Sequence, residues 1–377
     1  MGAVLFGLLV LLVIAGCLYQ AAAAWQVRRF AAAPRPRPSA RPPVSVMKPL
    51  CGDEPGLDRA LASTLAQDYP AFQVVFGVDD AADPALAVVR ALPPAPPGAE
   101  ITVATGPTGP ARNRKVANLL SMWPQVRHEV VVVADADVRT DAAYLDDLVA
   151  PLADPAVGAV TSLYVAHPGA GRASRLAALG INHGFLPSAL VARALGRADG
   201  CFGATIAIRR AVLEQGGGLA ALADLLADDW ALGAIARAQG LRIALSARPV
   251  EILVTEPGWR ALFDHELRWA RTIAAIDRPG ALASVVTQPV ALALLGAVLS
   301  GGAAPALALL ALAAGVRLAA VRVEESALGL PRCGLGDLAL REILSFAVYA
   351  VASAGRTVLW RGRRFVVRRD GTLEPRD

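Results

Sequence analysis

The sequence predicts an α/β fold with a mostly parallel, doubly wound sheet, an N-terminal transmembrane helix and C-terminal membrane helices. Strand-like and helix-like segments alternate from residue 44 onward, which is the order of a parallel sheet. The run Val130–Ala134 is continuously apolar, as in a strand buried on both faces. Residues 2–24 carry no charged side chain, and 55% of the chain is hydrophobic. A soluble domain with attached membrane segments accounts for all four observations.

The N-terminal apolar run is long enough to cross a bilayer core of about 30 Å at a rise of about 1.5 Å per residue. A cleaved signal peptide would carry positive charge before its apolar run, whereas Arg28 and Arg29 follow this one. We therefore expect an uncleaved anchor over residues 1–27, with the chain cytoplasmic from residue 28 by the positive-inside rule. Residues 28–43 are rich in Pro and Arg and are expected to form an extended linker.

The alternation that follows defines the nucleotide half of the expected domain. The expected strands are Val44–Leu50, Phe72–Val78, Ile101–Ala104 and Val130–Ala134, and the expected helices are Leu57–Gln67, Pro84–Leu92 and Asn113–Met122. In such sheets, ligands bind beyond the carboxyl ends of the strands. Four carboxylates fall there: Asp79, Asp80, Asp135 and Asp137.

Asp135 and Asp137 are two residues apart, so on an extended chain both side chains point the same way. Two hard oxygen ligands suit a Mg²⁺ or Mn²⁺ ion that carries a diphosphate. The alternative for an isolated Asp-x-Asp is a loop that is merely acidic.

Three later segments each allow a functional and a structural interpretation. The cations of Gly109–Asn118 open a helix beside the same edge, which suits phosphate or an ordinary helix start. The glycines of Gly200–Arg209 permit a close approach of a sugar, or serve a bulge. Asp228 and Asp229 precede a helix, as cap and first-turn acid or as a catalytic base.

The C-terminal third is expected at the membrane. Residues 258–283 have the pattern of an amphipathic helix lying among lipid headgroups, broken at Pro279-Gly280. Apolar runs follow over about 285–300, 304–321 and 338–356 within expected membrane segments 284–357, and Arg341 and Glu342 interrupt the third.

The topology of these apolar runs stays open. Either the first two form a hairpin and the third is re-entrant or interfacial, or the first two form one broken span and the third returns. The basic tail, residues 358–377, is expected in the cytoplasm as a small hairpin that turns at Asp370-Gly371.

The net charge of +5 reflects arginines that flank the apolar runs, and these favour anionic lipid headgroups over nucleic acid. None of the four cysteines forms a C-x-x-C pair, so neither a zinc site nor a disulfide framework is indicated.

Seven short motifs occur in a characteristic order. They are Val46-Met-Lys-Pro-Leu50, Gln67-Asp-Tyr-Pro70, Val78-Asp79-Asp80, Lys115-Val-Ala-Asn118, Asp135-Ala-Asp137, Asp228-Asp229-Trp230 and His265-Glu-Leu-Arg268-Trp269. The ordered set resembles membrane glycosyltransferases of family 21, the ceramide glucosyltransferase-like branch of the family 2 fold, over roughly residues 1–300. The resemblance implies a GT-A domain over 44–257, with a Rossmann-like nucleotide-sugar half (about 44–138) and an acceptor half (about 139–257).

The resemblance also implies a role for each motif residue. Asp79 or Asp80 would contact the uracil or ribose, and Lys115 would lie near the nucleotide. Asp135 and Asp137 would hold the metal and the diphosphate, with Asp135 the more direct metal ligand.

The later motifs would supply the base and the diphosphate clamp. Asp229 would be the general base beside Asp228, which replaces the family's more usual Glu. His265, Arg268 and Trp269 would clamp the diphosphate and wall the acceptor site, with His265 standing where the family has Gln or Arg.

The function implied is an inverting, metal-dependent transfer from a UDP-sugar to a membrane lipid hydroxyl at the bacterial inner membrane, with the catalytic domain in the cytoplasm. The string from His265 to Ile273 most resembles bacterial hopanoid-biosynthesis glycosyltransferases, which implies transfer of N-acetylglucosamine from UDP-GlcNAc to bacteriohopanetetrol. The alternatives are a ceramide glucosyltransferase that uses UDP-glucose and an inactive lipid-binding scaffold. A processive polysaccharide synthase would need more channel-forming helices than the last hundred residues supply.

Overall fold

The computed structural model describes residues 3–106, 111–197, 200–355, 357–360, 363–367 and 373–375. The chain forms two compact units. The sheet unit comprises Pro34–His167 and Ala198–Leu253, and the helical unit comprises Met1–Ala33, Pro168–Arg197 and Val254–Asp377. Residues 168–197, which we expected inside the catalytic range 44–257, thus pack within the helical unit.

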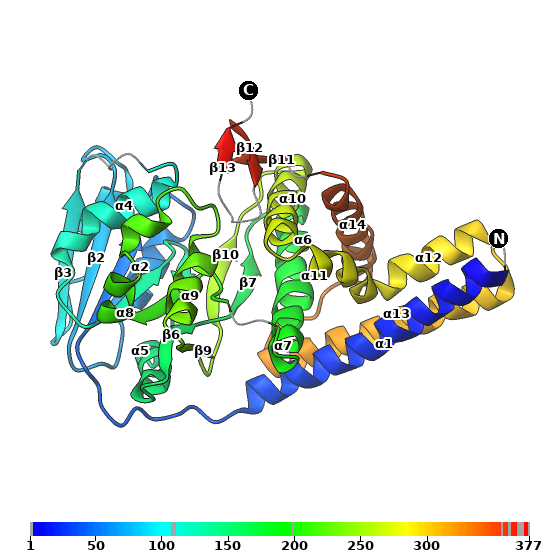
Figure 1. Cartoon of the computed structure of the whole chain (residues 1–377), viewed down its shortest axis with the longest axis horizontal. Helices are drawn as coiled ribbons and strands as arrows, with labels where there is room; N and C mark the ends of the chain where they lie inside the picture. The colour runs from blue at the N-terminus through cyan, green and yellow to red at the C-terminus, as the bar shows by residue number, and fades with distance from the viewer. Residues whose placement is uncertain are drawn as a thin grey trace. The chain divides into compact units, whose positions relative to one another are not determined.

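The sheet unit is built on a seven-stranded sheet in the order β3-β2-β1-β4-β8-β6-β9 (Figure 1). The strands are β1 (Val44–Pro49), β2 (Phe72–Val78), β3 (Ala99–Thr105), β4 (Val130–Ala134), β6 (Val157–Thr161), β8 (Thr205–Arg209) and β9 (Arg242–Leu245). β1 pairs in parallel with β2 and β4, β2 with β3, and β6 with β9. β8 runs antiparallel to both β4 and β6. The predicted mostly parallel α/β sheet is therefore confirmed, with β8 as its one reversed strand among the described residues.

A second sheet has the order β5-β10-β7. Its strands are β5 (Val138–Arg139), β7 (Tyr164–Pro168) and β10 (Val250–Val254). The helices of the sheet unit are α2 (Leu57–Leu65), α3 (Ala85–Arg90), α4 (Arg114–Met122), α5 (Tyr144–Val149), α8 (Arg210–Gln215) and α9 (Asp228–Ala238), with short 3₁₀ turns η1 (Trp123–Gln125), η2 (Ala150–Ala153) and η4 (Leu219–Leu222).

The continuously apolar strands lie at the centre of the sheet, as their composition predicts. Every residue of β2 and β4 is buried. On α4, Val116, Leu119 and Met122 recur at helical spacing and pack into the same core. The edge strand β3 is half exposed and begins earlier than expected, at Ala99 rather than Ile101. Gly98 marks that start, because its φ of +86° and a Cβ position 2.3 Å from Pro70 O exclude a side chain.

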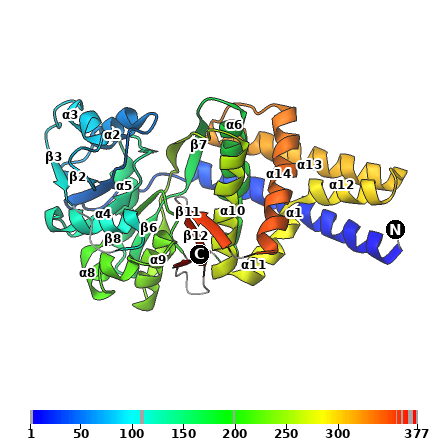
Figure 2. The same cartoon turned by 90° about the horizontal axis from the view of Figure 1, so that it is seen from above.

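The helical unit contains α1 (Ala3–Ala32) and a bundle from the C-terminal third. Its other helices are α6 (Arg172–Gly180), the π-helix η3 (Ile181–Phe185), α7 (Leu186–Ala194), α10 (Trp259–Ile276), α11 (Arg278–Ala283), η5 (Ser284–Thr287), α12 (Pro289–Leu299), α13 (Ala304–Leu328) and α14 (Leu335–Ser353). α13 packs along α1 (Figure 1), and α12 lies beside α13 (Figure 2). Leu9, Val13, Leu292, Ala293 and Ala313 form the shared apolar cluster.

Two boundaries in this unit differ from the expected ones. α1 continues to Ala32, five residues past the expected end of the anchor at residue 27, and ends where Pro34 disfavours a helical residue before it. The break in the amphipathic helix falls at Asp277 rather than at Pro279-Gly280. Asp277 caps α11 by accepting from the Gly280 N–H, and Pro279 is tolerated in the first turn of the new helix.

Two helices of the described chain are long and apolar enough to cross a membrane, Phe6–Ala32 and Ala304–Leu328. A third span exists if the pair Arg278–Thr287 and Pro289–Leu299, bent by 69°, forms one crossing. α14, which carries the buried Arg341 and Glu342, does not qualify. The expected N-terminal helix is thus present and is long and apolar enough to cross a membrane, and the topology of the C-terminal segments stays open.

The tail contains three antiparallel strands, β11 (Thr357–Trp360), β12 (Arg363–Val367) and β13 (Leu373–Pro375). The expected turn Asp370-Gly371 lies outside the described residues.

Candidate active site

Lys115 joins two of the carboxylates that the sequence singled out. Its Nζ lies 2.6 Å from Asp135 Oδ1 and 3.1 Å from Asp228 Oδ2. Asp135 directly follows β4, Lys115 is in the first turn of α4, and Asp228 opens α9. Burial alone would lower the pKa of Lys115, but the two carboxylates outweigh it and raise the pKa above its ordinary value. Three segments that are far apart in the sequence therefore meet in one ion-paired cluster in the sheet unit.

Asn113 fixes the two helix starts that this cluster needs. Its Oδ1 caps α4 by accepting from the N–H groups of Lys115 and Val116. Its Nδ2 donates to Leu225 O at 2.9 Å, in the segment that leads into α9. The cap therefore ties the position of Lys115 to that of Asp228.

Asp137 lies in a crowded acidic environment. Burial raises its pKa to about 7, and the neighbouring carboxylates of Asp135 and Glu54 add to the effect. Burial also raises the pKa of Asp135, against the opposing effect of Lys115. Bringing in a cation would relieve this crowding.

The donor set fits a divalent ion only together with substrate oxygens. No group of three or more His, Cys, Asp or Glu side chains could hold a metal within the described ranges. Mg²⁺ typically binds through one or two carboxylates and completes its shell with water and phosphate oxygens. Asp135 and Asp137 supply such a pair.

Asp229 has the environment of a base. Its Oδ1 accepts from the Trp230 N–H at 2.8 Å. Burial raises its pKa to about 6, and the Asp228 carboxylate adds to this. A Cβ at Gly203 would lie 3.0 Å from Asp229 Oδ2, so the glycine leaves this oxygen uncrowded. A carboxylate whose pKa lies this near neutrality can take up a proton and release it again.

Asp79 and Asp80 differ in what they can offer a ligand. Arg114 Nη2 donates to Asp79 Oδ2 at 2.8 Å. Asp79 Oδ1 is buried and has no hydrogen-bond partner within the part of the chain that the structure describes. Asp80 is exposed, and its Oδ1 accepts from the Ala82 N–H in a local turn. Of the two, Asp79 carries the acceptor that still needs a donor.

Sequence reasoning assigned no role to three further residues near these strand ends. Lys48 is fully buried, and its Nζ donates to Asp135 O and Val138 O. Burial lowers its pKa to about 8, against the raising effect of Asp137 and Asp135. The visible signal was a single charged residue in the otherwise uncharged strand β1.

The other two are Asn118 and Tyr164. Asn118 Nδ2 donates to Gly77 O at 2.9 Å and to Leu50 O at 3.3 Å, which joins the ends of β1 and β2. Burial raises the pKa of Tyr164, and the carboxylates of Asp229, Asp135 and Asp137 raise it further. No local pattern marks Tyr164, because the sheet β5-β10-β7 positions it.

His265, Arg268 and Trp269 lie on α10 in the helical unit. His265 Nδ1 is 2.7 Å from Glu256 Oε1, and its ring meets the Trp269 ring edge-on with centroids 4.5 Å apart. Burial lowers the pKa of Arg268, with Glu256 opposing the effect. The structure thus groups the acidic motifs and Lys115 in one unit and the His265–Trp269 motif in the other.

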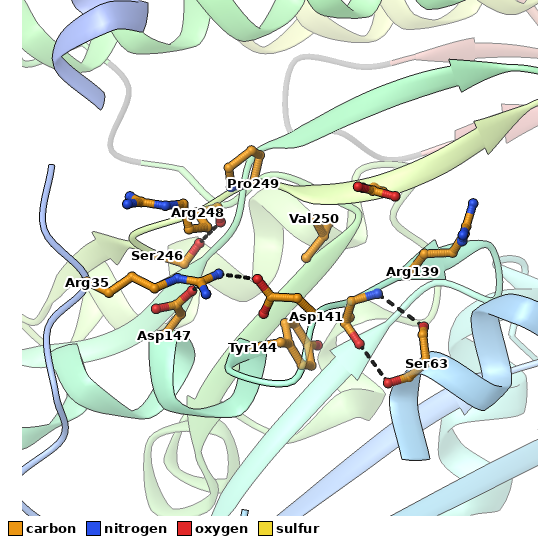
Figure 3. Close-up of a pocket in the computed structure, with 12 residues that line it drawn as sticks. Arg35, Ser63, Arg139, Asp141, Tyr144, Asp147, Ser246, Arg248, Pro249 and Val250 are labelled. Atoms are coloured by element: carbon orange, nitrogen blue, oxygen red, sulfur yellow. Dashed lines mark hydrogen bonds and ion pairs between the residues drawn. The ribbon is translucent and has the colours of Figure 1, made fainter. Parts of the chain in front are cut away.

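A separate pocket of about 150 Å³ lies in the sheet unit (Figure 3). None of the predicted site residues lines it. Arg35 points into it toward Asp141 and Asp147, with which it forms ion pairs. These contacts dock the start of the Pro/Arg-rich segment on the sheet unit, so residue 35 is not part of a free linker.

Comparison with known proteins places this chain in a family. The model of glycosyl transferase family 21 matches residues 8–373. Ceramide glucosyltransferase 1 of Caenorhabditis elegans is 26% identical over 212 residues, which are 55% of this chain and 45% of that protein. Ceramide glucosyltransferase of Komagataella phaffii is 28% identical over 101 residues, 25% of this chain and 19% of that protein. The matches span less than half the length of either relative.

Among solved structures, a mannosyltransferase from Pyrobaculum calidifontis in complex with GDP-Man and Mn²⁺ has 22% identity and a TM-score of 0.49, over 92% of this chain and 97% of that one. TarS 1-349 of S. aureus in complex with UDP-GlcNAc has 16% identity and a TM-score of 0.39, over 89% and 99%. The family match covers nearly the whole sequence, and on that ground the chain belongs to glycosyl transferase family 21.

Proposed function

We propose that this chain transfers a sugar from a UDP-sugar to a hydroxyl group of a membrane lipid, with inversion at the anomeric carbon and with a divalent metal ion. The observation that carries the proposal is the Lys115 bridge between Asp135 and Asp228, with Asp229 next in the chain. The bridge supports the proposal because it brings together, in the sheet unit, the residues to which we assign the cation for the diphosphate, a metal ligand and, next in the chain, the base.

Each residue has a role in this proposal. The buried Asp79 Oδ1 accepts from the imide N–H of uracil. Asp135 and Asp137 hold Mg²⁺ or Mn²⁺, which when bound neutralises the departing diphosphate as a Lewis acid. Lys115 adds a positive charge beside that diphosphate.

Asp229 acts on the acceptor. The acceptor oxygen forms a bond to the anomeric carbon while the bond from that carbon to the diphosphate oxygen breaks. The hydroxyl proton passes to the Asp229 carboxylate, and UDP leaves with the bonding electron pair. Because this is a single displacement, the anomeric configuration inverts. His265, Arg268 and Trp269 keep the role that the resemblance implies, contact with the diphosphate and the acceptor.

We further propose that the acceptor is bacteriohopanetetrol and the donor UDP-GlcNAc, on the basis of the string from His265 to Ile273. The two long apolar helices support a lipid acceptor and a location in the inner membrane with the sheet unit in the cytoplasm. The curated relatives named ceramide glucosyltransferase support the alternative, UDP-glucose and ceramide.

The test is a reaction of the purified full chain in detergent with UDP-GlcNAc or UDP-glucose, each acceptor in turn, and Mg²⁺, Mn²⁺ or chelator. Mass spectrometry of the lipids identifies sugar and acceptor, and a coupled assay measures UDP release. A metal-dependent hexosamine adduct on the hopanoid supports the proposal, and a hexose adduct on ceramide supports the alternative. A folded chain that releases no UDP with any donor would be the inactive lipid-binding scaffold.

A further inference from the structure

Lys48 carries a charge in the interior of the sheet. It is 0% exposed and lies near the end of β1, where Met47 is paired with Val133 on β4. A buried ammonium group is costly unless hydrogen bonds compensate it, and every other residue of β1 is uncharged. The position therefore needs a reason beyond packing.

The hydrogen bonds of Lys48 supply that reason. Its Nζ donates to Asp135 O at 2.9 Å and to Val138 O at 3.1 Å. The two acceptors are the carbonyls at the first and last residues of the turn that carries Asp135 and Asp137. The Val138 N–H also donates to Asp135 O, at 3.3 Å, and the Asp135 N–H to Ala204 O, at 3.0 Å. One amine thus clamps both ends of the turn through the main chain.

The clamp leaves the carboxylates available. Lys48 forms no ion pair within 4 Å with an acid of the described chain, whereas Lys115 pairs directly with the Asp135 side chain. Lys115 occupies one oxygen of Asp135, Oδ1, and a second lysine on these carboxylates would take further oxygens from a metal ion. A lysine that binds their backbone orients them without occupying a ligand oxygen, as outer-shell partners of metal ligands do.

We propose that Lys48 is a positioning residue that holds the Asp135–Val138 turn in the conformation that binds the metal ion and the donor diphosphate. The inference rests on the proposed function, which gives the turn these ligands to bind.

The test compares Lys48→Met, which keeps the chain length and removes the donors, with Gln73→Met. Gln73 is equally buried, on β2 opposite Ser45 at the far end of β1, and its Nε2 donates to Thr102 and to Gln125 O. Both substitutions remove buried hydrogen bonds from one sheet, but only the first removes those of the turn. Lys48→Gln retains one shorter donor and covers the case in which Lys48→Met does not fold.

Hydrogen exchange of the metal-free full chain in detergent, followed by mass spectrometry, reports on the turn without requiring activity. We expect peptides over 134–139 to exchange about tenfold faster in Lys48→Met and to an intermediate degree in Lys48→Gln, and to be unchanged in Gln73→Met. Equal exchange there in the Lys48 variants and Gln73→Met would overturn the proposal.

The second readout is calorimetry of UDP binding at increasing Mn²⁺ concentration. The Mn²⁺ concentration for half-maximal binding should rise about tenfold or more in Lys48→Met, the size of a lost outer-shell contact, and by less than about twofold in Gln73→Met. An equal rise in both variants would reduce Lys48 to a general stabilising role. A wild-type chain that binds no UDP with Mn²⁺ would instead overturn the proposed function, and the exchange data would still decide whether Lys48 holds the turn.

Discussion

Arg114 Nη2 lies 2.8 Å from Asp79 Oδ2, and the other oxygen of the Asp79 carboxylate is buried without a hydrogen-bond partner among the described residues. The ion pair uses one oxygen and holds the carboxylate in place. Buried acceptors in native proteins nearly always receive a hydrogen bond. A ligand N–H could donate the hydrogen bond that this second oxygen lacks.

Asp79→Ala is therefore expected to weaken UDP binding by about tenfold or more, the loss of a hydrogen bond to a charged group. The preference for UDP over ADP should fall with it, because the imide N–H belongs to uracil. Calorimetry with both nucleotides measures this. Arg114→Met is the control: it removes the exposed partner and should cost less than about threefold. Unchanged selectivity in Asp79→Ala would remove Asp79 from the uracil site.

Asp137 is the residue on which metal dependence can be tested most directly, because Asp135 also pairs with Lys115. Asp137→Ala should abolish the part of UDP binding that depends on Mn²⁺ and leave the metal-independent part. Calorimetry with Mn²⁺ and with chelator separates the two. Asp141→Ala, in the pocket that binds Arg35, is the control and should keep its response to Mn²⁺. An Asp137→Ala variant with unaltered Mn²⁺ dependence would show that Asp137 is not a ligand.

Sequence reasoning found the strands and the carboxylates at their ends for a local reason. A continuous apolar run by itself predicts a buried strand, and an acidic residue directly after the run indicates that the strand ends there, at the edge of the sheet. The same reasoning assigned no role to Lys48 and Tyr164, because the groups with which they interact lie in other segments of the chain. No local sequence pattern indicates those interactions.

The same distinction explains the boundaries. The helix breaks at Asp277 because its side chain accepts from the Gly280 N–H and caps the next helix. In the sequence, Pro279-Gly280 is the more obvious signal for a break, so the predicted position was two residues too late. Residues 168–197 show no change in composition that would separate them from the sheet unit, yet they pack with the helical unit. The Glu256 partner of His265 is nine residues away and precedes α10, so helical spacing does not reveal it.

The pH dependence of turnover should report Asp229. Burial raises its pKa from the ordinary 3.8 to about 6, so the carboxylate that we propose as the base is ionised above pH 6 and protonated below it. Turnover at saturating donor should fall about tenfold per pH unit below 6. Asp229→Asn should lower turnover by about 10²–10⁴-fold, with UDP binding within about threefold of wild type. Near-normal turnover in this variant would exclude Asp229 as the base.

Asp229 also links function to stability. Because the folded state holds the proton more tightly than the unfolded state, ionisation of Asp229 destabilises the fold, fully above about pH 6 and not at all below 3.8. Asp229→Asn should therefore unfold at a higher temperature than wild type at pH 7.5, and the difference should shrink toward pH 4. Asp224→Asn, an exposed carboxylate, is the control and should show no such trend. A destabilised Asp229→Asn at pH 7.5 would contradict the assigned environment.

His265 stands where the resemblance drawn from the sequence would place Gln or Arg, and its contacts define the test. Glu256 binds Nδ1 at 2.7 Å and Trp269 packs against the ring edge-on, so the orientation of Nε2 is set from two sides. Because the Glu256 carboxylate accepts from Nδ1–H, Nε2 can donate to the leaving diphosphate only from the doubly protonated imidazolium. If it does, His265→Ala should lower turnover by about tenfold or more while UDP affinity changes by less than about threefold. His265→Gln, which introduces one of the two residues that the resemblance implies here and supplies a donor, should recover most of that loss. Glu256→Gln keeps a hydrogen-bonding partner for Nδ1 and should lie between the two. Steady-state kinetics on the purified chain distinguishes these outcomes, and equal turnover in His265→Ala and wild type would return His265 to a packing role on α10.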